Sequence, residues 1–240
     1  MAQVVVKSRI PSSPIVVEAF PSKGFVSTIA ANQIIREMGM KLVGFIDSEE
    51  MEGIAVIRDS HPVRPMRVYQ KDRIFLLYSE VMVPFNSIAK VSSAINSWLD
   101  RIKPKKVVLM AGITGIENYG SHEIVGLASS PELAKELEAL KVRILKDGVL
   151  TGVASSILIH CTEKKIPAVG LMAETQYTPD AVAAASMLEL LNKLLKTNIN
   201  HEELKRMGKD VEEEFRKVIK QMKKGREGYG KLEENGPMYC

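Results

Sequence analysis

Short runs of apolar, often β-branched residues alternate along the chain with stretches whose apolar positions recur every three or four residues. The first pattern is typical of buried strands and the second of amphipathic helices. The first pattern predicts strands at 14–20, 42–47, 107–111 and 167–173. The second predicts helices at 26–38, 88–103, 131–140, 153–163 and 180–195. Glycines follow several of these strands. This alternation predicts an α/β fold with a mostly parallel sheet covered by helices on both faces.

The segment from residue 53 to residue 80 has a different pattern. Three short apolar runs, at 54–57, 66–69 and 74–78, are broken by His61-Pro62 and by Lys71-Asp72. Turn residues between short strands indicate hairpins or a meander. We expect these strands to lie along one side of the sheet.

The character of the chain changes after Asn198. Residues 199–224 predict one amphipathic helix, and glycines and scattered charges then predict a flexible tail over 225–240, which leaves residues 1–198 as the α/β core domain. Apolar residues recur on this helix at seven-residue spacing, which forms a narrow stripe of the kind that joins helices. The stripe is predicted either to contact another subunit or to pack on its own domain; its members are Leu204, Val211, Phe215, Val218 and Met222.

Composition and charge exclude several classes of protein. The formal charge of +4 is too small to imply nucleic acid. The basic run from Arg216 to Arg226 shares its helix with six acids between His201 and Arg226, which favours a solvated helix face over a nucleic-acid or membrane contact; the acids are Glu202, Glu203, Asp210, Glu212, Glu213 and Glu214. Cys161 and Cys240 form no disulfide framework and no zinc motif, and Cys161 reads as a small buried hydrophobe. With no signal peptide and no membrane-spanning run, we expect a cytoplasmic protein.

Candidate catalytic chemistry is sparse. The Gly112–Gly115 turn follows a buried strand, the turn at Gly148–Gly152 opens a helix, and Glu174 ends another strand. These positions suit a ligand site in an α/β fold, and they leave a nucleoside- or nucleotide-processing hydrolase or phosphorylase as the alternative function. Phosphate-binding glycine motifs, clustered histidines and a nucleophile elbow are absent. We therefore expect no catalytic residues, no metal and no cofactor.

The last three residues, Met238-Tyr239-Cys240, stand out from the polar stretch before them. They offer an apolar side chain, a phenol and a main-chain carboxylate, three groups that suit a pocket on another protein. The alternative interpretation is a frayed end.

Three segments carry a resemblance to a known family. Residues 148–158 (GVLTGVASSIL), residues 166–175 (IPAVGLMAET), and Pro179-Asp180-Ala181 before an alanine-rich helix resemble the proteasome assembly chaperone family. The early PIVVEAF run and the Gly112–Gly115 turn fit the same family. The resemblance spans roughly residues 10–200, and it is closest to archaeal homologues that end in a hydrophobic-Tyr-any (Hb-Y-X) tail.

The resemblance implies a nucleoside-phosphorylase-like core without catalysis, and a homo-oligomer, expected to be a tetramer. It also implies that the tail docks between α subunits of the proteasome core particle. Met238 would fill the apolar part of an intersubunit groove, Tyr239 would pack and hydrogen-bond at its rim, and the Cys240 carboxylate would pair with a lysine. Assembly of the ring and activation of the finished particle both remain open.

Overall fold

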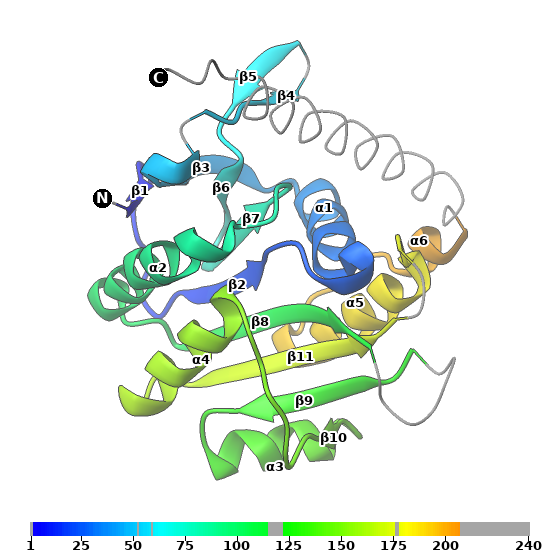
Figure 1. Ribbon diagram of the computed structural model, residues 1–240. Helices are drawn as coiled ribbons and strands as arrows, with labels where there is room; N and C mark the ends of the chain where they lie inside the picture. Colours follow the sequence, from blue (N-terminus) through cyan, green and yellow to red (C-terminus); the bar gives the residue numbers. More distant parts are fainter. Residues whose placement is uncertain (1, 52, 59, 115–121, 176–177, 207–240) are drawn as a thin grey trace, which may run out of the picture.

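A nine-stranded sheet runs through the computed structural model, which describes residues 2–51, 53–58, 60–114, 122–175 and 178–206 (Figure 1). Its strands lie in the order β1, β3, β6, β7, β2, β8, β11, β9, β10. In that order they cover Gln3–Val6, Lys41–Asp47, Met66–Lys71, Ile74–Ser79, Ile15–Ala19, Lys106–Ile113, Ala168–Glu174, Ile124–Ala128 and Arg143–Ile144.

The centre of the sheet is parallel and its flanks are largely antiparallel. Strands β7, β2, β8 and β11 run in the same direction, whereas β1, β3, β6 and β7 form successive antiparallel pairs. On the other flank β9 is antiparallel to β11 and parallel to β10. The predicted α/β class is confirmed, with parallel pairing concentrated where strands alternate with helices. Strands β1, β9 and β10 were not predicted, because each is short and lacks a long apolar run.

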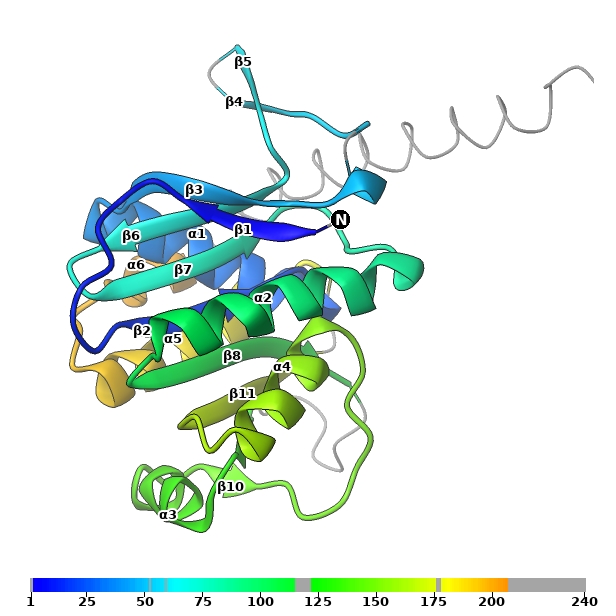
Figure 2. The same cartoon turned by 90° about the vertical axis from the view of Figure 1, so that its left-hand side faces the viewer.

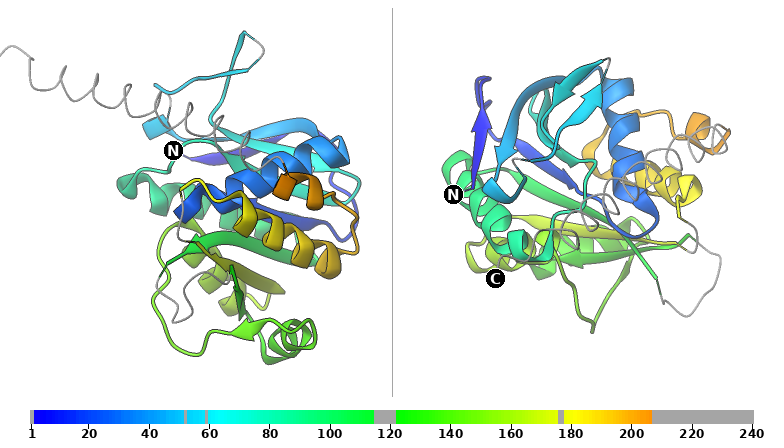
Figure 3. Two further views of the ribbon diagram at one scale, coloured as in Figure 1. Left: turned by 90° about the vertical axis from the view of Figure 1, so that its right-hand side faces the viewer. Right: turned by 45° about the horizontal axis from the view of Figure 1, so that its top comes forward.

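Helices cover both faces of the sheet. Helices α1 (Val26–Met38) and α5 (Ala181–Leu195) lie on one face with the short α6 (Glu202–Arg206), as the left view of Figure 3 shows. Helices α2 (Ile88–Ile102) and α4 (Val153–Glu163) lie on the other face, and α3 (Pro131–Ala139) packs near β9 and β10. The described ranges also contain three single-turn 3-10 helices: η1 (Lys23–Phe25), η2 (Glu49–Met51) and η3 (Phe85–Ser87).

The core is divided between the two faces. Successive side chains of a strand point to opposite faces, so β2 sends Val16 towards α2 and α4 and Val17 towards α1 and α5. Both valines are almost completely buried. This burial on both sides explains why the central strands read as continuous apolar runs. Cys161 lies on the buried face of α4, as its apolar surroundings predicted, and burial raises the pKa of its thiol to about 12.

Local signals explain where several helices begin. The Ser130 side chain accepts a hydrogen bond from the Leu133 N–H, and Pro131 follows it at the first helical position of α3. Asp180 caps α5 in the same way, since its Oδ1 accepts from the Ala183 N–H at 2.9 Å. The predicted bounds of these helices and of α4 are confirmed to within a residue.

A separate hairpin projects from the sheet (Figure 2). It consists of β4 (Val56–Arg58) and β5 (His61–Val63), which pair with each other in a two-stranded sheet of their own. The prediction of short strands in this segment is confirmed, but His61-Pro62 lies inside a strand instead of interrupting one. Proline is tolerated there because each strand of so small a sheet has an open edge. Among the described helices, none has the length and apolar character needed to cross a membrane.

Candidate functional site

The predicted docking residues Met238, Tyr239 and Cys240 lie outside the described residues, as do four members of the apolar stripe: Val211, Phe215, Val218 and Met222. The structure describes the chain as far as Arg206, which lies within the predicted C-terminal helix. Residues 197–206, which include the turn after α5 and helix α6, are here called the α6 root. This segment joins the core to everything that follows, so its attachment decides where the remaining chain leaves the molecule.

A single amide side chain holds the turn that leads from α5 into the α6 root. Asn192 Nδ2 donates to the Ile199 carbonyl at 2.8 Å, and Asn192 Oδ1 accepts from the Ile199 N–H at 2.9 Å. The same oxygen accepts from the Thr197 hydroxyl at 2.9 Å. One residue thus satisfies both main-chain groups of Ile199, and the turn is tied to the last turns of α5.

Helix α1 holds the next part of the root. Gln33, which is buried, donates from Nε2 to the Asn200 carbonyl at 2.7 Å. The Asn200 side chain in turn accepts from the Glu203 N–H at 3.0 Å, which caps the first turn of α6. Arg36 of α1 lies 3.6 Å from Glu203 across the surface. The contacts come from α1 and α5 together, so they orient the start of α6 as well as attaching it.

Apolar burial completes the attachment. Ile199 and Leu204 are 2% and 3% exposed, and both belong to the core that α1 and α5 form on the sheet. Leu204 was predicted as a member of the oligomer stripe. In the structure it packs within its own chain, because the turn at Ile199 brings α6 back onto α5. Leu204 therefore anchors the C-terminal segment to the core, and the other four stripe positions carry the oligomer prediction.

The carboxyl ends of the parallel strands form the edge where α/β proteins commonly bind ligands. Gly112 lies there, and its N–H donates to Ser22 Oγ at 2.8 Å. A Cβ on Gly112 would stand 1.9 Å from the Lys23 carbonyl oxygen, so the loop between β2 and α1 lies directly against β8. The glycine thus serves a close approach between main chains. Its N–H is already engaged, which does not favour the phosphate site considered in the alternative function.

The second candidate turn, at Gly148–Gly152, opens α4 as expected. Gly152 is the N-cap, with a φ of 93° that favours glycine, and no side chain caps the helix. Ser155 Oγ donates back to the Gly152 carbonyl at 2.7 Å. The described geometry is that of a turn and a helix start.

A polar cluster lies where β11 ends. Glu174, Thr175 and Asp180 are all buried. Thr175 Oγ1 donates to Asp180 Oδ2 at 2.8 Å, and His122 Nδ1 lies 3.4 Å from the same oxygen. Because the other oxygen of Asp180 caps α5, this carboxylate is committed to the start of that helix. Within the described ranges no three His, Cys, Asp or Glu side chains gather as metal ligands would.

Glu18 is a buried acid that was not predicted from the sequence. It lies on β2 in the central sheet and is 2% exposed. Burial raises the pKa of its carboxyl to about 8, and a hydrogen bond from the Phe20 N–H to Oε1, at 3.0 Å, offsets part of that rise. Among the described residues, Oε2 has no hydrogen-bond partner. The only signal in the sequence was one acid inside a strand that otherwise reads as buried.

Glu80 gathers a second polar network that was not predicted. It forms ion pairs with Arg67 of β6 and with Arg58 of the β4–β5 hairpin, and Tyr78 OH donates to its Oε1 at 3.0 Å. Tyr78 OH also lies 2.9 Å from Asn32 of α1. Burial raises the pKa of the Tyr78 phenol far above its usual range, and the nearby Glu80 charge adds to this. The network connects the projecting hairpin to the sheet and to α1.

These features define a class: an α/β protein whose polar residues at the sheet edge mostly hold loops and helix ends, with an anchored C-terminal segment. Comparison with known proteins agrees. The model of the PAC2 family matches residues 16–219, and this chain belongs to the PAC2 family. An uncharacterized protein of Methanocaldococcus jannaschii is 31% identical over 241 residues, which cover 98% of this chain and 97% of that protein.

Solved structures give the same result. The crystal structure of Pyrococcus furiosus PbaA, an archaeal homolog of proteasome-assembly chaperone, is similar with a TM-score of 0.85 and 30% identity. It covers 94% of this chain and 100% of PbaA. Pyrococcus furiosus PbaB, an archaeal proteasome activator, has the same fold with a TM-score of 0.75 and 22% identity, over 91% of this chain and 98% of PbaB. The predicted membership of the proteasome assembly chaperone family is confirmed.

Proposed function

We propose that this protein binds the proteasome core particle as a non-enzymatic assembly chaperone or activator, and that its C-terminal tail is the docking element. Met238 enters the apolar part of a pocket between two α subunits, and Tyr239 packs and hydrogen-bonds at the rim. The Cys240 carboxylate pairs with a lysine of the pocket. A carboxylate at this place identifies a true chain end, so the pocket recognises the terminus as well as the side chains.

The observation that carries the proposal is the combination of the terminal Met-Tyr-Cys sequence with membership of this family. Similarity to Pyrococcus furiosus PbaA, an archaeal homolog of proteasome-assembly chaperone, supports the partner. The α6 root supports the geometry, since Gln33 and Asn192 hold the start of the segment that leads to the tail.

Several tails acting together would make the contact strong. A single tripeptide offers little buried area, so one tail alone binds weakly. A homo-oligomer, for which a tetramer is our expectation, presents several tails to one ring of α subunits. Linked sites gain on the order of 10²–10⁴ in apparent affinity where the geometry permits simultaneous binding. Oligomerisation is therefore part of the proposal, with Val211, Phe215, Val218 and Met222 as its contact residues.

The test compares three proteins for binding to purified proteasome α-rings, by size exclusion with light scattering. They are the full-length chain, a form lacking residues 238–240, and a form with one glycine added after Cys240. We expect the deletion to abolish binding and the added glycine to weaken it, because the carboxylate is then displaced. The same runs give the oligomer size, which should not differ among the three. Undiminished binding by the deleted form would contradict the tail as the docking element.

A second measurement separates the two activities. Peptide hydrolysis by the finished core particle should rise when the protein is added if the tail opens the gate. Recovery of complete rings from separate α subunits should rise if the protein assists assembly.

A further inference from the structure

One edge of the sheet is open in the part of the chain that the structure describes. Strand β1 is last in the strand order, and among the described strands it pairs with β3 alone. The β1–β3 register continues to Lys7, which lies opposite Val43. The Lys7 N–H donates to the Val43 carbonyl at 2.8 Å, so Lys7 and Val43 form a hydrogen-bonded pair. Main-chain groups alternate in direction along an antiparallel pair. The N–H and C=O groups of Val4 and Val6 therefore point away from β3, towards the open edge.

A groove lies beside this edge. One wall is β1, through Ala2, Gln3 and Val4, and the other wall is α2. The volume of the groove is about 530 Å³. Figure 2 shows α2 running alongside β1 over much of its length. A row of unpaired main-chain groups on one wall makes the groove suited to an extended chain.

The α2 wall explains why the groove has room. Ala89, Ser93 and Ser97 are four residues apart, so they lie on one stripe of the helix, and all three are exposed. Their side chains are small, and the buried Ala94 and Trp98 form the floor beside them. Five residues of added strand span about 16 Å, close to the roughly 18 Å of helix between Ala89 and Arg101. The α2 wall is therefore matched in length to one short strand.

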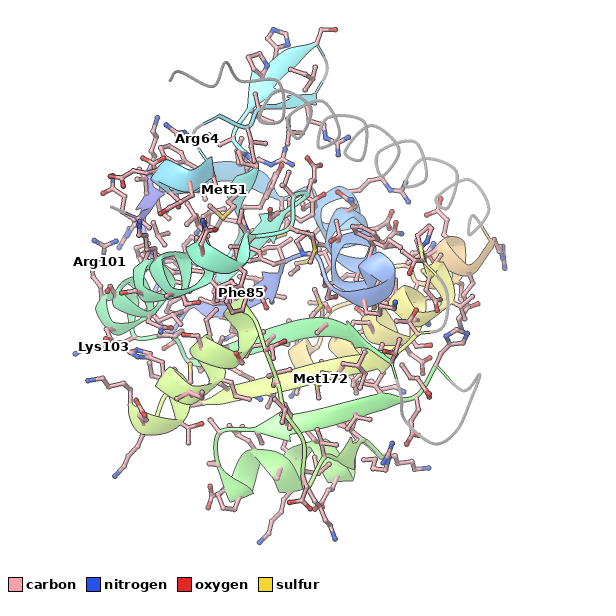
Figure 4. All side chains as sticks on the ribbon, viewed as in Figure 1. Met51, Arg64, Phe85, Arg101, Lys103 and Met172 are labelled. Atoms are coloured by element: carbon pink, nitrogen blue, oxygen red, sulfur yellow. The ribbon has the colours of Figure 1, made fainter. Side chains whose placement is uncertain are left out.

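Charge at the groove indicates what kind of chain fits. Lys90 forms an ion pair with Glu50, whereas Arg101 is exposed and has no carboxylate within 4 Å among the described residues. Arg101 lies at the C-terminal end of α2, near Lys103 (Figure 4). A guanidinium in this position binds a carboxylate in a bidentate manner.

A second copy of this chain is a poor match for this groove. If β1 of one copy paired with β1 of another, it would bring Lys7 and Arg9 but no acid, because residues 1–9 contain none. Such a pair would supply no carboxylate for Arg101. A strand from a different protein can carry one.

We propose that the groove between β1 and α2 is a docking site for an extended acidic peptide of a partner protein. The peptide adds as a strand to β1, with hydrogen bonds to Val4 and Val6. Alternate side chains, apolar and of moderate size, lie over Ala89, Ser93 and Ser97, and an Asp or Glu pairs with Arg101. This site is separate from the C-terminal tail, so the two contacts are tested independently.

Selection of peptides tests the proposal directly. A phage-displayed library of random twelve-residue peptides is selected on the full-length protein and counter-selected on the double variant Ser93→Arg/Ser97→Arg, which fills the groove at two exposed positions. We expect peptides with alternating β-branched residues and at least one acid. Failure to enrich any peptide over the counter-selected pool overturns the proposal.

The selected peptide is then titrated by fluorescence anisotropy. Arg101→Glu should weaken binding at least tenfold, whereas the matched control Lys103→Glu, with the same charge change at a residue outside the groove lining, should weaken it less than twofold. Equal effects of the two variants would show general electrostatic attraction and would overturn the proposed contact.

Hydrogen exchange identifies strand addition itself. The amides of Val4 and Val6 should exchange at least tenfold more slowly when the peptide is bound, while the Val5 amide, which faces β3, provides the internal control. Unchanged exchange at Val4 and Val6 would exclude pairing along β1.

Discussion

Arg67 Nη2 lies 2.8 Å from Glu80 Oε2, and the side chains of both residues are almost completely buried, at 5% and 6% exposed. The contact is an ion pair without the angles of a hydrogen bond, and within the described part of the chain Oε2 has no hydrogen-bond partner. Arg67 also lies over the rings of Tyr69 and Tyr78, with its guanidinium carbon 5.7 and 5.2 Å from their centroids. A buried cation is thus compensated by one carboxylate and two aromatic faces.

Replacing Glu80 should be strongly destabilising. Glu80→Gln leaves the buried guanidinium of Arg67 without its counter-charge, and removal of one partner from a buried pair costs about 3–5 kcal/mol. Urea unfolding measures the change. The exposed pair between Arg64 and Asp47 supplies the control, and Arg64→Gln should cost less than about 1 kcal/mol. Equal losses of unfolding free energy in the two variants would show that the buried Glu80–Arg67 pair contributes no more to stability than the exposed pair does.

Glu18 should make stability depend on pH. The pKa of its carboxyl is about 8 in the folded protein and near 4.5 when the chain is unfolded. The folded state therefore keeps the carboxyl proton up to a higher pH than the unfolded state does. The contribution of Glu18 to the free energy of unfolding is therefore greatest below pH 4.5, and it declines as pH rises towards 8. The loss from this group at pH 7 is on the order of 3 kcal/mol.

The variant Glu18→Gln isolates that effect. Glutamine keeps an oxygen acceptor for the Phe20 N–H but cannot ionise. The difference in unfolding free energy between variant and wild type should therefore grow in favour of the variant between pH 5 and pH 8.5, as followed by urea unfolding. A difference that stays constant across this range would show that the Glu18 carboxyl does not take up a proton on folding.

Gly112→Ala should disrupt the loop between β2 and α1. The added methyl would stand 1.9 Å from the Lys23 carbonyl oxygen, and main chain cannot move aside as a flexible side chain does. We expect a loss of at least about 2 kcal/mol in unfolding free energy. Gly53→Ala is the matched control, because its Cβ would meet nothing within 4 Å. Comparable stability of the two variants, measured by thermal unfolding, would contradict the close approach at Gly112.

Leu204→Ala should loosen the α6 root. Truncating a buried leucine costs about 2–5 kcal/mol where the surroundings do not collapse, and here much of that cost falls on the docking of one short helix. Amide exchange at Ile199 and Glu203, whose N–H groups bond to Asn192 and Asn200, should become faster. The exposed neighbour provides a control, and Glu202→Gln should leave both amides unchanged. Unaltered exchange in Leu204→Ala would mean that the hydrogen bonds alone hold the root.

Periodicity alone determined most of the elements of this protein. The strands around Val16, Val108 and Val169 are buried on both faces. Their continuous apolar runs therefore predict strands without knowledge of which strands lie beside them. The helices from α1 to α5 each bury one face or more, which leaves a pattern in the sequence. The family resemblance rested on local segments as well, and the family is shown by the PAC2 match. The terminal Met-Tyr-Cys motif remains a prediction, since it lies outside the described residues.

Only the tertiary structure decided which residues from distant parts of the sequence lie in contact. Leu204 reads as one position of a helical stripe, and only the turn at Ile199 makes it part of the core. Glu18 and Glu80 are both acids near apolar runs, yet among the described residues Glu18 has no cation beside it and Glu80 pairs with two arginines. The sequence of β1 does not say that it ends the sheet beside α2. Periodicity depends on residues a few positions apart, whereas charge pairing, desolvation and open edges depend on chain segments brought together from far along the sequence.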